Sequence, residues 1–275
     1  MTDAAGDALR HDPTIERSDA YYAMHSSDEC AALAEELLQS GAEDGRAIGL
    51  RLLCRAAVGE TRFHAALADA AVVAARDSSA QVRAAAAHIA GEVPTVRSID
   101  LLVGLVRDRS AEVRAAVAGS LALADDAEPP NPRVVGALLL LTADGDALVR
   151  DLAAFALGTQ LTTADNAAVR AALHRLLLEP DTDDAYPAAE AAMGLALRGD
   201  SSVAAVIAER LRAGGAGQLW LDAAAALALP ELLPALCAIR EPGDDVNDPW
   251  VQALDRAIAA CGPGNGTTSG AAATP

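Results

Sequence analysis

The chain has 275 residues, of which 52% are hydrophobic and only 3% aromatic, and its formal net charge is −18 at pH 7. The apolar residues are mostly Ala, Leu and Val, and small helix-forming side chains let helices pack closely, so the composition favours an all-α fold over a sheet. A surface this acidic repels the phosphate backbone of nucleic acids, so we expect no nucleic-acid partner and instead a basic or neutral protein.

Two features of the side-chain inventory limit the chemistry of the chain. All 21 basic residues are Arg and there is no Lys, which excludes Schiff-base and P-loop chemistry that needs a Lys side chain. The four cysteines, Cys30, Cys54, Cys237 and Cys261, form no C-x-x-C pair and stand among apolar residues. We expect them to be small buried side chains.

The N-terminal segment, residues 1–27, is polar and mixed in character, and it lacks the basic start and apolar stretch of a signal peptide. The longest apolar run, Val134 to Ala143, is about half as long as a bilayer-spanning helix. We therefore expect a cytoplasmic protein that has no membrane partner.

Residues 28–261 contain an internal repeat. Three segments align without gaps, and each reads D-x-x-x-x-V-R followed by small or apolar residues on one helical face. They are DSSAQVRAAAAHIAG from Asp77, DRSAEVRAAVAGSLA from Asp108 and DGDALVRDLAAFALG from Asp144, with Arg83, Arg114 and Arg150 at equivalent positions.

The same frame continues outward with weaker matches. The positions equivalent to the Arg are Arg46, the three central arginines, Tyr186, Trp220 and Gln252, and they are 31 to 37 residues apart. That interval is the length of one helix–turn–helix unit. Between successive positions lies a second helical pattern of apolar residues at i, i+3, i+4 and i+7, as in SIDLLVGLVR from Ser98.

Each marker residue has a physical role in this arrangement. The Asp lies in the turn before the second helix, where a carboxylate accepts hydrogen bonds from unpaired backbone N–H groups. The Val enters the core. The Arg can reach the Asp of an adjacent turn, which predicts a ladder of charge-assisted hydrogen bonds along the stack.

This pattern resembles the HEAT-repeat family, in the variety with a strong D-x-x-x-x-V-R second helix. The resemblance covers about residues 28–261 and is most specific in the three central units. It implies a right-handed α-solenoid (superhelix) of about seven HEAT-like helical hairpins, acting as a non-catalytic scaffold that binds proteins through the solenoid surface. Residues 262–275 are predicted to be a disordered tail, and we expect a monomer.

Side chains suited to catalysis or metal binding are scattered. The sequence has no G-x-S-x-G or H-E-x-x-H motif and no zinc-type spacing of Cys and His. Asp181, Asp183 and Asp184 resemble the start of a calcium loop, but Tyr186 and Ala192 stand where the loop needs Gly and Glu, so we expect a solvated acidic turn. We expect no catalytic residue, no metal and no cofactor.

Two enzyme classes with HEAT-like architecture stay open as alternatives. DNA glycosylases need a basic groove, aromatic residues and a catalytic carboxylate. Trp220 with Asp222, and Trp250 with Asp248, would supply some of these groups, but the acidity argues against this reading. Lyases that attach bilin pigments need a pigment pocket, which nothing in the sequence identifies. Both Trp residues are otherwise core residues at the end of the stack or exposed anchors.

The resemblance implies that the second helices line the concave face. We expect residues one, four and five places after each Arg position to point away from the core and form a groove of small side chains. This groove would hold a helix or an extended segment of a basic or neutral protein. Its predicted contacts are Phe155 as the large apolar anchor and His88, Asp151, Glu190 and Asp222 as polar groups.

Overall fold

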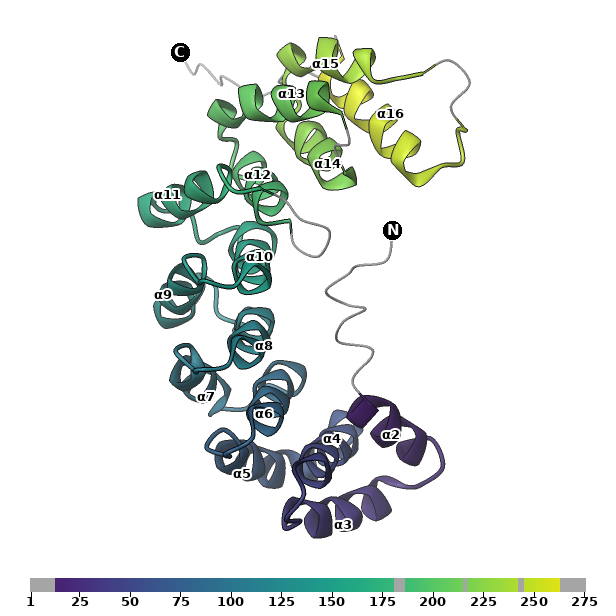
Figure 1. The fold of residues 1–275 in the computed structure, drawn as a ribbon, viewed down its shortest axis with the longest axis vertical. Coiled ribbons are helices and arrows are strands. Elements are labelled where there is room, and N and C mark those ends of the chain that lie inside the picture. Colours follow the sequence, from purple (N-terminus) through teal and green to yellow (C-terminus); the bar gives the residue numbers. More distant parts are fainter. Residues whose placement is uncertain (1–12, 181–185, 215–216, 242–244, 263–275) are drawn as a thin grey trace, which may run out of the picture.

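The computed structural model describes residues 13–180, 186–214, 217–241 and 245–262, and these residues contain helices and no β-strand. The helices pair into seven hairpins that stack into an open arc, which confirms the predicted solenoid (Figure 1). The hairpins are α3 (Ser27–Leu38) with α4 (Glu43–Gly59), α5 (His64–Ala74) with α6 (Ala80–Glu92), α7 (Ser98–Leu105) with α8 (Ala111–Leu121), α9 (Pro132–Leu141) with α10 (Ala147–Phe155), α11 (Ala167–Leu176) with α12 (Pro187–Leu197), α13 (Ala204–Ala213) with α14 (Gln218–Leu227), and α15 (Leu233–Ala238) with α16 (Pro249–Cys261).

Polar side chains cap several of these helices. The carboxylate of Asp146 accepts the N–H groups of the first turn of α10, and Asn166 and Asp248 do the same for α11 and α16. Ser26 and Glu29 form a capping box at the start of α3. These oxygens pair backbone donors that have no partner inside the helix, which is why the turns can be short.

The second helices of the hairpins form one continuous layer, in which each contacts the next from α4 to α16. Figure 1 shows this layer on the concave side of the arc and the first helices α5, α7, α9 and α11 on the convex side. Leucines of both layers fill the space between them, and Leu102, Leu121 and Leu138 are fully buried. Neighbouring hairpins therefore share their apolar core.

Small residues bring neighbouring second helices into close contact. A Cβ atom on Gly91 of α6 would lie 2.8 Å from the Cβ of Ser120 in α8. A Cβ atom on Gly194 of α12 would lie 2.5 Å from the Cα of Gly158, in the π-helical turn η2 (Ala156–Gln160) that continues α10. Both distances are shorter than real Cβ contacts, so larger side chains at these points would push the helices apart.

These contacts also fix the register of the fifth repeat. In the first contact, Gly91 stands eight places after Arg83 and Ser120 stands six places after Arg114. In the second, Gly158 stands eight places after Arg150, so Gly194 stands six places after its own reference position, which is Ala188. Ala188 is fully buried, whereas Tyr186 precedes α12 and is half-buried. The predicted equivalence of Tyr186 is therefore wrong by two residues.

The two ends of the arc differ from its centre. Helix α2 (Pro13–Tyr22) lies within the segment expected to be polar and packs on α4, where Arg55 and Asp19 form an ion pair of 2.8 Å. The predicted boundaries at residues 27 and 262 stay predictions, and residues 263–275 of the expected tail lie outside the described residues. Within the described ranges, no helix has the length and hydrophobicity that a membrane crossing requires.

The cysteines are free thiols, and their burial depends on their place in the stack. Cys30, Cys54 and Cys261 are buried, as predicted. Cys237 is exposed, so the prediction is wrong for this residue. It lies on α15, the last first-layer helix, which has another first-layer helix on one side alone.

We expect Gly194→Ala to lower the free energy of unfolding by about 1–3 kcal/mol, because the added methyl group would overlap the backbone of Gly158. The matched control is Gly136→Ala in α9, where an added Cβ meets nothing within 4 Å. That change should raise stability by about 0.5–1 kcal/mol through helix propensity. Urea denaturation measures both. Unchanged stability of Gly194→Ala would contradict the close contact.

Candidate functional site

The predicted ladder of arginines is present in the turns between first and second helices. Arg46 donates from Nε and Nη2 to the carboxylate of Asp77 at 2.7 and 2.8 Å. Arg83 makes the same bidentate pair with Asp108 at 2.7 and 2.9 Å. The third pair, at 2.7 and 2.8 Å, joins Arg114 to Asp144. Each Arg of one repeat therefore holds the Asp of the next repeat, as the sequence predicts.

Every ladder residue also closes its own turn. The Nη1 group of Arg83 donates to the backbone carbonyl of Asp77 at 2.8 Å, and the carboxylate of Asp77 accepts the N–H of Ser79 at 2.8 Å. The same pattern recurs at the next two turns. One guanidinium thus ties together two consecutive turns, and every polar group in the set has a partner.

The ladder lowers the pKa of its carboxyl groups. For Asp108 the main cause is the hydrogen bond from Arg83, supported by the N–H of Ser110, while burial acts in the opposite direction. The side chains of this pair are only 9% and 7% exposed. Removing one partner of so buried a pair leaves the other charge without compensation.

We expect Asp108→Asn to lower the free energy of unfolding by about 3 kcal/mol at neutral pH, because Arg83 would remain buried without its counter-charge. The control is Asp100→Asn, whose partner Arg133 is 56% exposed, and it should cost less than about 1 kcal/mol. Because folding lowers the pKa of Asp108, its contribution is complete above the unfolded pKa of about 4 and is lost as the pH falls further. The difference in the free energy of unfolding between the parent and Asp108→Asn should therefore be smaller at pH 3 than at pH 7, as measured by denaturation curves at both pH values. An equal difference at both would refute this role.

Beyond α10 the ladder changes. Arg150 donates to the carboxylate of Glu179 at 2.6 Å instead of to an Asp. In the next repeat Ala188 stands at the Arg position. Arg198, which directly follows α12, forms the polar contacts at this point of the stack instead. The guanidinium of Arg198 donates to five backbone carbonyls at 2.6 to 3.2 Å, those of Leu157, Gly158, Leu161, Ala164 and Gly194.

Arg198 is a structural residue that the sequence reasoning missed. Four of its five acceptors lie at or just after η2, where the carbonyls at a helix end lack partners inside the helix, and the fifth, Gly194, lies in α12. Burial lowers the pKa of this guanidinium. Backbone carbonyls have no sequence signature, so no pattern in the chain could have predicted these contacts.

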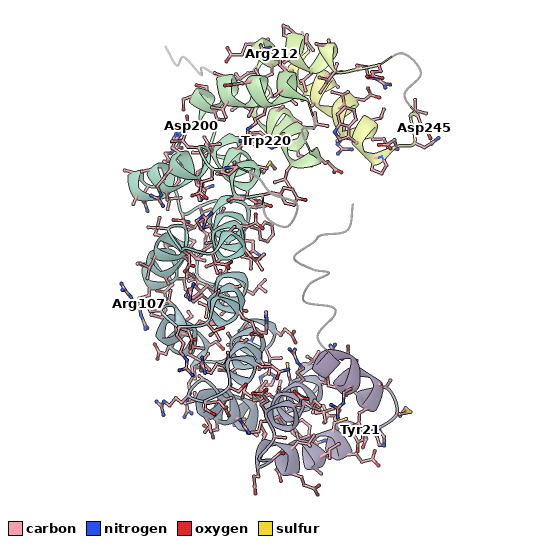
Figure 2. The ribbon with its side chains drawn as sticks, viewed as in Figure 1. Tyr21, Arg107, Asp200, Arg212, Trp220 and Asp245 are labelled. Atoms are coloured by element: carbon pink, nitrogen blue, oxygen red, sulfur yellow. The ribbon has the colours of Figure 1, made fainter. Side chains whose placement is uncertain are left out.

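Asp200 closes the turn that follows α12 (Figure 2). Its carboxylate accepts from the hydroxyl and the N–H of Ser202 and from Nε2 of His174, and these contacts lower its pKa to about 2. Nη1 of Arg170 lies 3.3 Å from the same carboxylate. The group ties α11 to the turn after α12, and the lowered pKa keeps Asp200 charged at neutral pH.

The contacts of the second helices define the surface that faces the concavity. Helix α10 contacts α8 and α12 at its two sides and α9 behind it, so its solvent-facing residues point into the arc. These residues are Leu148, Leu152, Phe155 and Thr159, which recur at helical spacing. We call the equivalent solvent-facing surface of all second helices the inner face.

The inner face carries an apolar stripe over three successive helices. Leu123, in the turn that continues α8, is 54% exposed, Phe155 of α10 is 38% exposed and Leu197 of α12 is 43% exposed. Leu152 and Met193 are half-buried beside them. We call these five residues the inner stripe. The sequence analysis identified Phe155 alone, because Leu123 and Leu197 lie at helix ends, outside the positions it considered.

Most of the predicted contact residues lie on this face. His88 of α6, Glu190 of α12 and Asp222 of α14 are half-buried there, and Phe155 is exposed, as expected. Asp222 accepts from Nη2 of Arg256 at 3.3 Å. His88 and Phe155, five places after their Arg positions, therefore face solvent, as do Glu190 and Asp222, two places after Ala188 and Trp220. Whether a partner contacts any of them stays a prediction.

Asp151 does not lie on the inner face, so its expected exposure is wrong. Its residue exposure is 8%, and its Oδ1 accepts the N–H of Tyr186 at 3.0 Å. Residues one and four places after an Arg position pack against the flanking second helices, as the buried Ala84, Ala87 and Ala154 also show. The groove of small side chains predicted at these positions is in fact a helix–helix contact.

We expect Asp151→Arg to lower the free energy of unfolding by about 3 kcal/mol or more, because the larger cation would replace a buried carboxylate that holds the start of α12. Glu190→Arg, on the half-buried surface of α12, should change stability by less than about 1 kcal/mol. Thermal unfolding followed by circular dichroism separates the two. Equal melting temperatures would show that Asp151 is not buried in solution.

The two Trp residues belong to the end of the stack. Trp220 of α14 is 3% exposed, and the guanidinium of Arg210 lies 5.3 Å from the centre of its ring (Figure 2). Trp250 is half-buried against the same core. Trp220 is therefore a core residue rather than an exposed anchor.

In the described ranges, no group of three or more His, Cys, Asp or Glu residues is arranged to hold a metal ion. Asp181, Asp183 and Asp184, which resemble the start of a calcium loop, lie outside the described residues.

Residues 67–158 match a family model described as HEAT repeats. Residues 67–158 are therefore HEAT repeats. The matched segment covers the central hairpins that contain the three aligned Arg positions, and the same hairpin architecture continues on both sides of it. No curated protein matches the chain.

Solved structures share the fold of the chain. YibA of Escherichia coli is 24% identical, with a TM-score of 0.66 over 84% of this chain and 81% of YibA. A chain of the Pds5–Scc1 complex is 13% identical, with a TM-score of 0.50 over 85% of this chain and 40% of that chain. The CpcE–CpcF complex of phycocyanin lyase from Nostoc sp. is 19% identical with a TM-score of 0.40, over 84% of this chain and 94% of that one, and supports no statement about function. These likenesses establish the fold alone.

Proposed function

We propose that this protein is a non-catalytic scaffold that binds another protein on its inner face. The observation that carries the proposal is the inner stripe, in which three large apolar side chains are each more than a third exposed within a concavity. Contiguous exposed apolar groups mark interaction sites, and aromatic side chains such as Phe155 often anchor them.

The dimensions of the stripe favour a protein partner over a small molecule. It extends over α8, α10 and α12, and neighbouring packed helices lie about 8–10 Å apart, so its length is about 20 Å. Small-molecule sites are instead enclosed pockets with a few convergent polar groups. A protein of similar fold occurs in the Pds5–Scc1 complex, which joins two proteins, and this is consistent with the proposal.

Charge adds a second criterion for the partner. The chain has a net charge of −18, and Glu112 and Glu190 lie on the inner face beside the stripe, while Asp222 of α14 is paired with Arg256. A partner with basic residues around an apolar contact would therefore be attracted at long range and discriminated from acidic proteins. We accordingly propose a basic or neutral protein partner.

We expect the double variant Phe155→Asp with Leu197→Asp to lose its partner, because two charges would enter the apolar contact. The control is Leu140→Asp with Leu178→Asp, which changes two leucines, 39% and 84% exposed, on or beside the first-layer helices α9 and α11. Affinity capture from the native cell with quantitative mass spectrometry compares the parent and both variants. Both variants should melt within a few degrees of the parent. Capture of the same proteins by parent and inner-face variant would rule out this surface.

A further inference from the structure

We infer that the inner face binds one amphipathic α-helix of about 20 residues, laid across α8 to α14, with basic side chains along one flank. This inference rests on the proposed function and specifies the kind of segment that binds. Four features of the described residues support it: the hydrogen-bonding capacity of the stripe, the repeat distance, the relief of the surface and the position of its charges.

The side chains of the stripe offer a ligand backbone no hydrogen bonds. They belong to three Leu, one Phe and one Met, none of which has a polar N–H or O–H donor, and Leu152 and Met193 lie inside helices, where backbone groups are bonded within the helix. An extended segment on this surface would lose water from its N–H and C=O groups without replacement. A helix pairs its own backbone groups and brings only side chains to the contact. The surface therefore favours a helix over a strand.

The repeat distance fits a helix that lies along the stack. Neighbouring second helices are about 8–10 Å apart, and seven residues of an α-helix advance about 10.5 Å. A ligand helix can thus present residues seven apart to consecutive second helices. Adjacent positions, three or four residues away, complete an apolar face of the kind that amphipathic helices bury.

The relief of the inner face sets the size of the ligand side chains. From α8 to α14, the residues five places after the Arg positions form a row: Gly119 of α8, Phe155 of α10, Met193 of α12 and Ala225 of α14. His88 of α6 holds the next equivalent position, beyond Gly119. The side chains of this row are large at its two middle positions and small or absent at its two ends. A Cβ atom on Gly119 would meet only the Cδ2 atom of Leu152, at 4.0 Å, so space is open above it.

A complementary helix has small residues at its centre and large apolar residues toward its ends. The low ends of the row, Gly119 and Ala225, are three helix spacings apart, which corresponds to about 20 residues of the ligand helix. Large ligand side chains would fill the space above these two positions. Small ones would pass over Phe155 and Met193.

The charges lie on one side of the row. Glu112 stands seven residues before Gly119, and Glu190 and Asp222 each stand three residues before their row members, so all three lie toward the N-terminal ends of the second helices. On the opposite side, Leu123 and Leu197 extend the apolar surface. A ligand helix would therefore place Arg or Lys residues on one flank only.

The test is a selection from a displayed library of random 20-residue peptides on the full chain, with counter-selection on the Phe155→Asp, Leu197→Asp variant. We expect the enriched peptides to carry apolar residues at helical spacing with Arg or Lys on one flank, and to gain helical circular dichroism when they bind. Gly119→Leu should weaken the binding of these peptides about tenfold, because its side chain would fill the open space at that end of the row, and it should not lower the melting temperature of the protein. Gly119→Ala, the matched control, should change affinity less than about threefold.

The outcomes separate this inference from the proposed function. Peptides that need the inner face but contain Pro at their centre, show no helical period or bind Gly119→Leu as tightly as the parent would overturn the helix and leave the protein-binding proposal intact. A selection in which no peptide discriminates the parent from the inner-face variant would overturn both.

Discussion

The close contact between consecutive second helices is the constraint on which this structure depends. At Gly91 against Ser120 and at Gly158 against Gly194, the backbones approach so closely that a single added methyl group would overlap a neighbour. This separation lets the apolar core run from hairpin to hairpin, because no unit buries its own apolar face. It also aligns the turns, so that Arg83 meets Asp108 and Arg114 meets Asp144 with the same bidentate geometry. The charged ladder is a consequence of the packing as much as a support for it.

The ladder could be predicted from the sequence because each Asp that it uses stands the same number of residues before an Arg of its own repeat. Asp77, Asp108 and Asp144 stand six residues before an Arg, and stacking alone brings each Arg to the next Asp. The fold class and the number of hairpins followed from the same periodicity. The Asp151 contact did not, because its burial depends on helices on both sides of α10, which one helical period cannot reveal. Arg198 escaped prediction because its acceptors are backbone carbonyls.

The inner face was predicted in outline and corrected in detail. A helix that is flanked on two sides and backed on a third exposes a narrow strip, so only some of the expected positions reach solvent. Phe155 and Glu190 lie on that strip, whereas Asp151 packs beneath it. The alignment error at Tyr186 arose because the fifth repeat has no Arg to fix its register, and only the contact between Gly158 and Gly194 restores it.

The distribution of the ladder bears on how the arc deforms. A bidentate pair fixes the plane of the guanidinium against the carboxylate, so it resists twisting of one hairpin relative to the next. Such pairs follow one another from α4 to α10, after which Ala188 and Trp220 occupy the Arg positions and cannot form ion pairs. Bending or torsion of the molecule is therefore resisted by bidentate ion pairs up to α10. Beyond α10 it is resisted by the hydrogen bonds from Arg198 to backbone carbonyls, and the inner stripe lies across the point where one kind of contact gives way to the other.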